Sequence, residues 1–153
     1  MQEWSKELKF SFQSEANNVV YIFELVFDNG TKLKVDFGYY PYKRVETGKK
    51  LDSLDIDSEF DIAINKVLTI SQRSNVKDFV DLYFLLKKYS LWDLVEGKKV
   101  KFNMKTEPVL LAADFLKVED FEQLPQMIKP LTLNQLKSFF REEAKKISQY
   151  SLE

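Results

Sequence analysis

The feature that most constrains this chain is a change in the spacing of its apolar residues near residue 58. Before it, "LKFSFQ" (8–13), "VVYIFELVF" (19–27) and "TKLKVDF" (31–37) are alternating or β-branched and aromatic segments, which are typical of strands. After it, apolar residues recur every three or four positions, which is typical of amphipathic helices. This order predicts an α+β fold, with a short antiparallel or mixed β-sheet from the N-terminal third packed against a C-terminal helical bundle.

Local signals place the individual turns and helices. "DNG" (28–30) predicts a hairpin turn between the second and third strands. Helices are expected at 59–71 with Ser58 as N-cap, at 76–88 with Asn75 as N-cap, and at 90–96 ending at Gly97. Two more are expected at 108–116, with a proline in the first turn, and at 132–149. We therefore expect a β-rich part (1–55) and a helical part (56–153), packed as one domain.

Two absent residue types narrow the chemistry. The 153 residues, 44% of them hydrophobic, are enough for one domain with a core, yet they include no Cys and no His. Disulfides, thiolate nucleophiles, cysteine zinc sites and a serine–histidine triad are therefore excluded. Chemistry would depend on carboxylates, Lys, Arg, hydroxyls and hard cations such as Mg²⁺, which prefer oxygen ligands.

Charge and hydropathy set further limits. Lys and Arg total 23 against 24 acids, which argues against a general nucleic-acid coat but not against a local basic patch. The sequence has no run of 18 apolar residues, so no membrane span is predicted. The start "MQEWSKELKF" lacks the apolar centre and cleavage site of a signal peptide. These observations predict a cytoplasmic protein that does not enter a membrane.

Asp36 is a candidate on the third strand. Alternation places Leu33, Val35 and Phe37 on one face and Asp36 on the other. The simpler interpretation of Asp36 is a solvated acid balancing neighbouring lysines, and the alternative is a catalytic carboxylate. The pair Asp55 and Asp57 has the spacing of a metal site, but we interpret it as a polar loop before a helix.

Five charged residues on the first two helices form a second set of candidates: Lys66, Arg73, Lys77, Asp78 and Asp81. Each has a structural explanation, because a lysine can extend to water, an Arg favours a helix C-terminus and Asp78 favours a first turn. Asp81 is harder to explain, since it interrupts an apolar run. Acids three apart share a helix face, so Asp78 and Asp81 could hold a cation or orient a base.

Taken in order, three segments resemble the AbiEii/AbiGii toxin family of nucleotidyltransferases, which belongs to the polymerase-β-like minimal nucleotidyltransferases. They are "LKVDFGYYPY", "LDIDSEFDIAINKVLTISQRSNVKDFVDLYFLL" and "VLLAADFLKVEDFEQLPQMI…LNQLKSFF". The family commonly shows a strand ending in an acid, Asp-(Leu/Ile)-Ala-x-x-Lys on a helix, an Arg, and Lys-Asp-x-x-Asp-Leu-Tyr. The matching positions are Asp36, 61–66, Arg73 and 77–83, and the likeness covers roughly residues 20–145.

The resemblance implies a role for each candidate. Asp36 would bind metal and activate the attacking hydroxyl. Lys66 would contact the nucleotide phosphates, with Arg73 and Lys77 adding positive charge. Asp78 and Asp81 would complete the catalytic site or orient Lys66. The implied substrate is a nucleoside triphosphate with Mg²⁺, the acceptor an RNA or protein, and the partner an antitoxin in a toxin–antitoxin or abortive-infection (phage-defence) system.

One part of the family pattern is missing. The first motif, a Gly-Ser or Gly-Gly turn followed by Asp-x-Asp, has no counterpart among the 35 residues before Asp36, where Asp28 is the only aspartate. The chain is expected to correspond to the C-terminal two-thirds of the family, as a truncated product, a non-catalytic remnant or half of a split protein. Alone it should be a poor catalyst, and its uncovered sheet surface should favour homo-oligomers. The alternative function is a non-catalytic interaction module.

Overall fold

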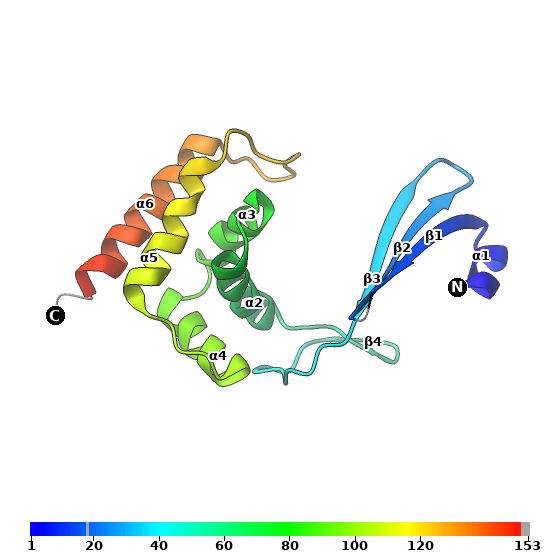
Figure 1. The fold of residues 1–153 in the computed structure, drawn as a ribbon, viewed down its shortest axis with the longest axis horizontal. Helices are drawn as coiled ribbons and strands as arrows, with labels where there is room; N and C mark the ends of the chain where they lie inside the picture. Colours follow the sequence, from blue (N-terminus) through cyan, green and yellow to red (C-terminus); the bar gives the residue numbers. More distant parts are fainter. Residues whose placement is uncertain (18, 151–153) are drawn as a thin grey trace. The chain divides into compact units, whose positions relative to one another are not determined.

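The computed structural model describes residues 1–17 and 19–150, and it separates the chain into two compact units, Met1–Pro41 and Tyr42–Glu153 (Figure 1). The predicted α+β class is confirmed, with an antiparallel sheet in the N-terminal third and helices after it. The strands of the described residues end at Asp55 and the next helix begins at Glu59, while the two compact units divide between Pro41 and Tyr42. That the two parts pack as one domain stays a prediction.

The first unit is a three-stranded sheet preceded by a short helix. Strands β1 (Phe10–Ala16), β2 (Val20–Phe27) and β3 (Lys32–Gly38) are antiparallel in the order β1-β2-β3. The turn predicted at 28–30 is present: Gly30 has φ +80°, and the Asn29 side chain accepts a hydrogen bond from the Thr31 amide at 2.9 Å. Helix α1 (Gln2–Glu7) was not expected, and the first strand after it begins at residue 10 instead of residue 8.

The strand register gives this sheet one face without charged residues. Phe12 lies opposite Leu25, which in turn lies opposite Leu33, so the alternate residues of all three strands share a side. Two of them, Phe10 and Leu25, are buried, whereas Leu33 and Phe37 are each 49% exposed. We call this set the apolar sheet face: Phe10, Phe12, Ser14, Ala16, Tyr21, Phe23, Leu25, Phe27, Leu33, Val35 and Phe37.

The second unit is helical. It contains α2 (Glu59–Gln72), α3 (Val76–Leu85), α4 (Leu91–Phe102), α5 (Pro108–Leu116), the short 3₁₀ helix η1 (Lys117–Asp120) and α6 (Leu133–Tyr150). Helix α2 packs against α3, α4 and α5, and α5 packs along α6, as Figure 1 shows. The largest fully buried side chains of its core are Phe79, Phe115, Phe140, Ile64, Ile70 and Leu82. A small hairpin of β4 (Lys50–Leu51) and β5 (Leu54–Asp55) precedes α2.

Both predicted caps are present. The Ser58 hydroxyl accepts a hydrogen bond from the Asp61 amide at 2.9 Å, and the Asn75 side chain accepts one from the Lys77 amide at 3.0 Å. Each cap satisfies an amide that the first helical turn leaves without a partner. Helix α2 follows its predicted range within a residue, whereas α3 ends at Leu85, three residues before the expected end.

The prediction that a helix ends at Gly97 was wrong. Helix α4 continues to Phe102, and the left-handed residue after it is Asn103 (φ 55°). A Cβ added at Gly97 would lie 2.5 Å from Cδ1 of Ile64. The glycine therefore permits close packing of α4 on α2, and this packing holds the backbone helical despite the low propensity of glycine.

Candidate functional site

The helical unit brings four predicted site residues together. The ammonium nitrogen Nζ of Lys66 lies 2.8 Å from Oδ1 of Asp78 and 2.6 Å from Oδ2 of Asp81. The guanidinium of Arg73 donates to the same Asp78, from Nε to Oδ2 at 2.8 Å and from Nη2 to Oδ1 at 3.2 Å. We call these four residues the Lys66 cluster.

Local structure explains why they meet. Arg73 follows the last residue of α2, and Asn75 caps the start of α3, so only a short connection separates the two helices. Asp78 then lies in the first turn of α3, where a carboxylate is favoured by the helix dipole. Because α2 and α3 pack together, Lys66 faces both acids across the interface.

The cluster runs from the protein interior to the surface. The Asp78 side chain is only 2% exposed, and Lys66 is 22% exposed. Asp81 and Arg73 are 51% and 62% exposed. Both oxygens of the buried carboxylate accept charge-assisted hydrogen bonds, while the second acid on Lys66 remains in contact with solvent.

The cluster stabilises the charged form of each of its buried members. Burial by itself would raise the pKa of Asp78, but hydrogen bonds from Arg73 and Lys66 outweigh it, and the pKa falls below its ordinary value. Burial would likewise lower the pKa of Lys66, yet the hydrogen bonds to Asp78 and Asp81 raise it. Lys66 is therefore a permanent cation at neutral pH.

The other two predicted residues lie apart from these contacts. Lys77 is exposed and lines a groove beside Asp81. Asp36 belongs to the first unit, on the face opposite the apolar sheet face, where it is 49% exposed and lies 3.5 Å from Nζ of Lys34. This is the environment of a solvated strand acid. The catalytic and metal-binding roles of Asp36 stay predictions.

The predicted Mg²⁺ has no preformed set of ligands in the part of the chain described. No three acidic side chains come together there in a way that could hold a metal ion. Both oxygens of Asp78 already accept bonds from cations, which makes that carboxylate a poor metal ligand. Asp36 is the one residue predicted to bind the ion.

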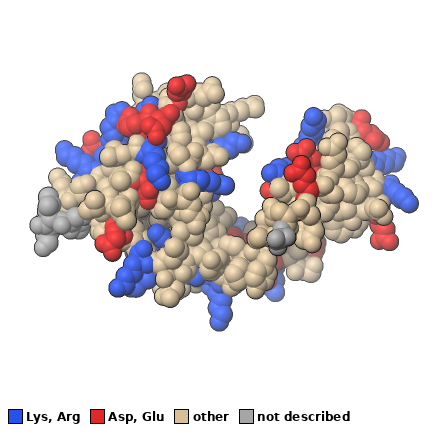
Figure 2. Space-filling view, viewed as in Figure 1, with Lys and Arg blue, Asp and Glu red and all other residues tan. Residues whose placement is uncertain are grey.

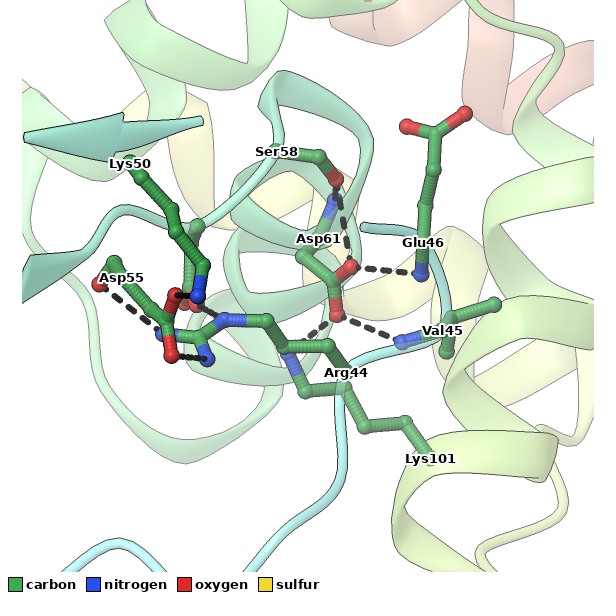
Figure 3. A network of polar contacts seen from close by, with 9 residues as sticks. Arg44, Val45, Glu46, Lys50, Asp55, Ser58, Asp61 and Lys101 are labelled. Carbon is green, nitrogen blue, oxygen red and sulfur yellow. Dashed lines mark hydrogen bonds and ion pairs between the residues drawn. The ribbon is translucent and has the colours of Figure 1, made fainter. Parts of the chain in front are cut away.

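A second buried carboxylate forms a site that sequence reasoning missed. Asp61 is fully buried, and its Oδ1 accepts a hydrogen bond from Nζ of Lys101, also fully buried, at 2.6 Å (Figure 3). Its oxygens also accept bonds from the amides of Val45 (3.0 Å) and Glu46 (2.9 Å) and from the Ser58 hydroxyl. We call these residues the Asp61 cluster.

The Asp61 cluster ties the segment before β4 to α2 and α4. Burial by itself would raise the pKa of Asp61, but the Lys101 ammonium and the two amides lower it. Lys101 was not among the predicted site residues because helix α4 was expected to end at Gly97. The available signal was spacing: Lys101 lies seven residues after Leu94, on the buried face of α4.

Asp55 and Asp57 bind an arginine of the same unit. Nε of Arg44 lies 2.6 Å from Oδ1 of Asp57. Nη2 of Arg44 donates to the Asp55 carbonyl at 3.0 Å, and Figure 3 shows these two residues side by side. Part of the expected polar loop is ordered as strand β5, which ends at Asp55. Their Asp-x-Asp spacing therefore has a structural explanation.

A groove of about 620 Å³ lies beside the Lys66 cluster. It is lined by Ile62 of α2, by Lys77, Asp81 and Phe84 of α3, and by residues 125–129. We call it the α2–α3 groove. Since Asp81 lines the groove and also binds Lys66, the groove and the cluster are continuous.

Comparisons with known proteins place few limits on the function. The sequence matches no protein-family model, and no solved structure matches it. An alignment of 70 positions, which covers 44% of this chain, is 40% identical to Uncharacterized protein aq_aa25 of Aquifex aeolicus (strain VF5). The match spans about a third of that relative's length (34%). Within residues 1–17 and 19–150, no helix is long and apolar enough to cross a membrane.

Proposed function

We propose that this chain is a nucleotidyltransferase-fold protein of the AbiEii/AbiGii type, whose Lys66 cluster binds the phosphates of a nucleoside triphosphate. The observation that carries the proposal is the environment of Lys66, which is held by a buried carboxylate beside an arginine and still reaches solvent. Fold and phosphate-binding cations do not by themselves fix the reaction.

The geometry supports a particular mode of phosphate binding. Asp78 is buried and binds both Lys66 and Arg73, so it holds the two cations in place. Asp81 is half exposed, and its ion pair with Lys66 can exchange at low cost, as surface ion pairs contribute about 0–1 kcal/mol. A phosphate oxygen would replace Asp81 at Lys66, and the Arg73 guanidinium would offer it further N–H donors.

The remaining predicted roles complete the proposal. Asp36 would take the proton of the attacking hydroxyl, and it is the residue that would hold Mg²⁺ if the ion accompanies the nucleotide. The acceptor would be an RNA or protein, in the cytoplasm, with an antitoxin as regulatory partner. Transfer would require the first family motif, supplied outside this sequence.

Calorimetric titration with each Mg-NTP tests the proposal. Lys66→Met should weaken binding at least tenfold with a small change in Tm, because Asp78 keeps Arg73 as a partner. Lys99→Met is the matched control, since that lysine is exposed and pairs with Glu96, an exposed acid of the same helix. Binding by Lys66→Met and Asp36→Asn that equals the wild type would contradict the assignment.

A second candidate function, a non-catalytic remnant or interaction module of such a system, is favoured by the apolar sheet face. This face has no charged residue, and several of its large side chains are half exposed. Sedimentation velocity of the wild type should show concentration-dependent homo-oligomers. Leu33→Lys with Phe37→Lys should abolish them, and a monomeric wild type would exclude self-association.

A further inference from the structure

We infer that the α2–α3 groove binds the nucleoside part of the nucleotide, with the base against its apolar wall and the phosphates at the Lys66 cluster. The inference rests on the proposed function and specifies where its substrate lies. The groove's volume falls within the range of about 300–1,000 Å³ typical of small-molecule sites.

The groove wall is apolar and comes from three separate segments. Ile62 contributes from α2, Val80 and Phe84 from α3, and Met127 from the segment before α6. The Phe84 ring is partly buried, and the ammonium of Lys129 lies over it, 5.2 Å from the ring centroid. Nucleobases stack on aromatic rings with little preference for one base over another, so the wall suits a purine or a pyrimidine.

The charges of the groove favour an anion. In the free protein each of its acids has a cationic partner, Glu59 with Lys88 and Asp81 with Lys66. Its lysines, Lys77 and Lys129, form no ion pair with any acid in the described residues. The groove thus combines an apolar wall with two lysines outside its ion pairs, of which Lys129 also lowers the pKa of Glu59 through its charge, and this matches a ligand with an apolar body and a phosphate chain.

Methionine labelling provides a direct test in the wild-type chain. The sequence has three methionines, and Met127 lies in the groove whereas Met104 is 47% exposed outside it. With ¹³C-methyl methionine, we expect ATP, GTP, CTP or UTP to shift the Met127 signal and leave Met104 in place. Inorganic tripolyphosphate, which has no base, should bind but leave Met127 nearly unshifted.

Affinity measurements give a second, independent readout. We expect the best nucleoside triphosphate to bind at least tenfold more tightly than tripolyphosphate. Phe84→Ala should remove this advantage and leave tripolyphosphate binding unchanged. Leu110→Ala, on the exposed face of α5, is the control. Ile62→Ser, at a side chain that is 39% exposed, serves if Phe84→Ala does not fold.

The outcomes separate this inference from the proposed function. Equal affinity for nucleotide and tripolyphosphate, with Met127 unshifted, would overturn the groove but retain the phosphate site. Failure of both ligands to bind would overturn both proposals. Nucleotide binding that shifts Met127 and is unchanged in Lys66→Met would support the groove and contradict the phosphate role of Lys66.

Discussion

Asp61 and Asp78 occupy equivalent places in the sequence of their helices and have different structural surroundings. Each is the third residue of its helix, and each follows a polar N-cap, Ser58 or Asn75. Both carboxylates are buried, and cations lower the pKa of both. In sequence, both are acids that favour a helix N-terminus.

The two carboxylates differ in whether the side chains that bind them are buried or reach solvent. The Asp61 carboxylate binds a fully buried lysine and two backbone amides, so this ion pair is closed to solvent. Asp78 binds Lys66 and Arg73, which extend to the surface, and Lys66 also holds the half-exposed Asp81. A closed cluster can only stabilise the fold, whereas an open one can exchange a partner for a ligand. Figure 2 shows lysines and acids interspersed over the molecular surface in that view, so surface charge alone would not single out the site.

The largest expected effect follows from removal of the closed carboxylate. Asp61→Ala breaks a fully buried ion pair with Lys101, which costs about 3–5 kcal/mol for buried pairs. Guanidinium unfolding would measure the loss. Asp93→Ala is the matched control, because Asp93 is also the third residue of a helix but is exposed. Equal losses in the two variants would remove the distinction between closed and exposed acids.

Removal of the open carboxylate should cost less. In Asp78→Ala, Lys66 and Arg73 can turn to solvent, so we expect a loss of about 1.5–3 kcal/mol, as for hydrogen bonds to charged groups. The double variant with Lys66→Met should be more stable than the sum of the single losses predicts, since the two residues share one interaction. A loss as large as that of Asp61→Ala would mean that this cluster is structural too.

Stability should depend on pH only outside a broad plateau. Without His or Cys, no side chain with an ordinary pKa titrates between about pH 5 and 7. The folded-state pKa values of Asp61 and Asp78 are lowered, so the unfolded chain takes up protons first and stability falls below about pH 4. The folded-state pKa of Lys66 is raised, so the stability that its charged form contributes should be lost at alkaline pH, above about pH 10.4.

Thermal denaturation across this pH range would measure both limbs. Asp78→Asn should have a shallower acid limb than the wild type because one titrating group is gone. An acid limb with the wild-type slope in Asp78→Asn would contradict the stabilised carboxylate.

The smallest stability effect is expected at Asp81. Asp81→Asn removes one surface-exposed ion pair and should change the free energy of unfolding by less than about 1 kcal/mol. Because Asp81 competes with phosphate for Lys66 in the proposed mode, tripolyphosphate should bind the variant more tightly than the wild type. Weaker binding would show that phosphate does not replace Asp81.

Much of the fold was predictable because local rules decided it. The period change separated strands from helices, and both caps were identified from Ser58 and Asn75. The error at Gly97 had a non-local cause, since that glycine accommodates Ile64 of another helix. A local end signal cannot reveal a packing requirement that comes from 33 residues earlier in the chain.

The sequence by itself determined the α+β class, most helix boundaries, the absence of His and Cys chemistry, and a set of charged candidates on two successive helices. Only the tertiary structure decided which candidates touch. It placed Lys66 in contact with Asp78 and Asp81, and it buried Asp61 against Lys101, which is forty residues away in the sequence. The physical reason is that helix formation depends on near neighbours, whereas the burial of a charge depends on which distant cation packing brings within hydrogen-bond distance.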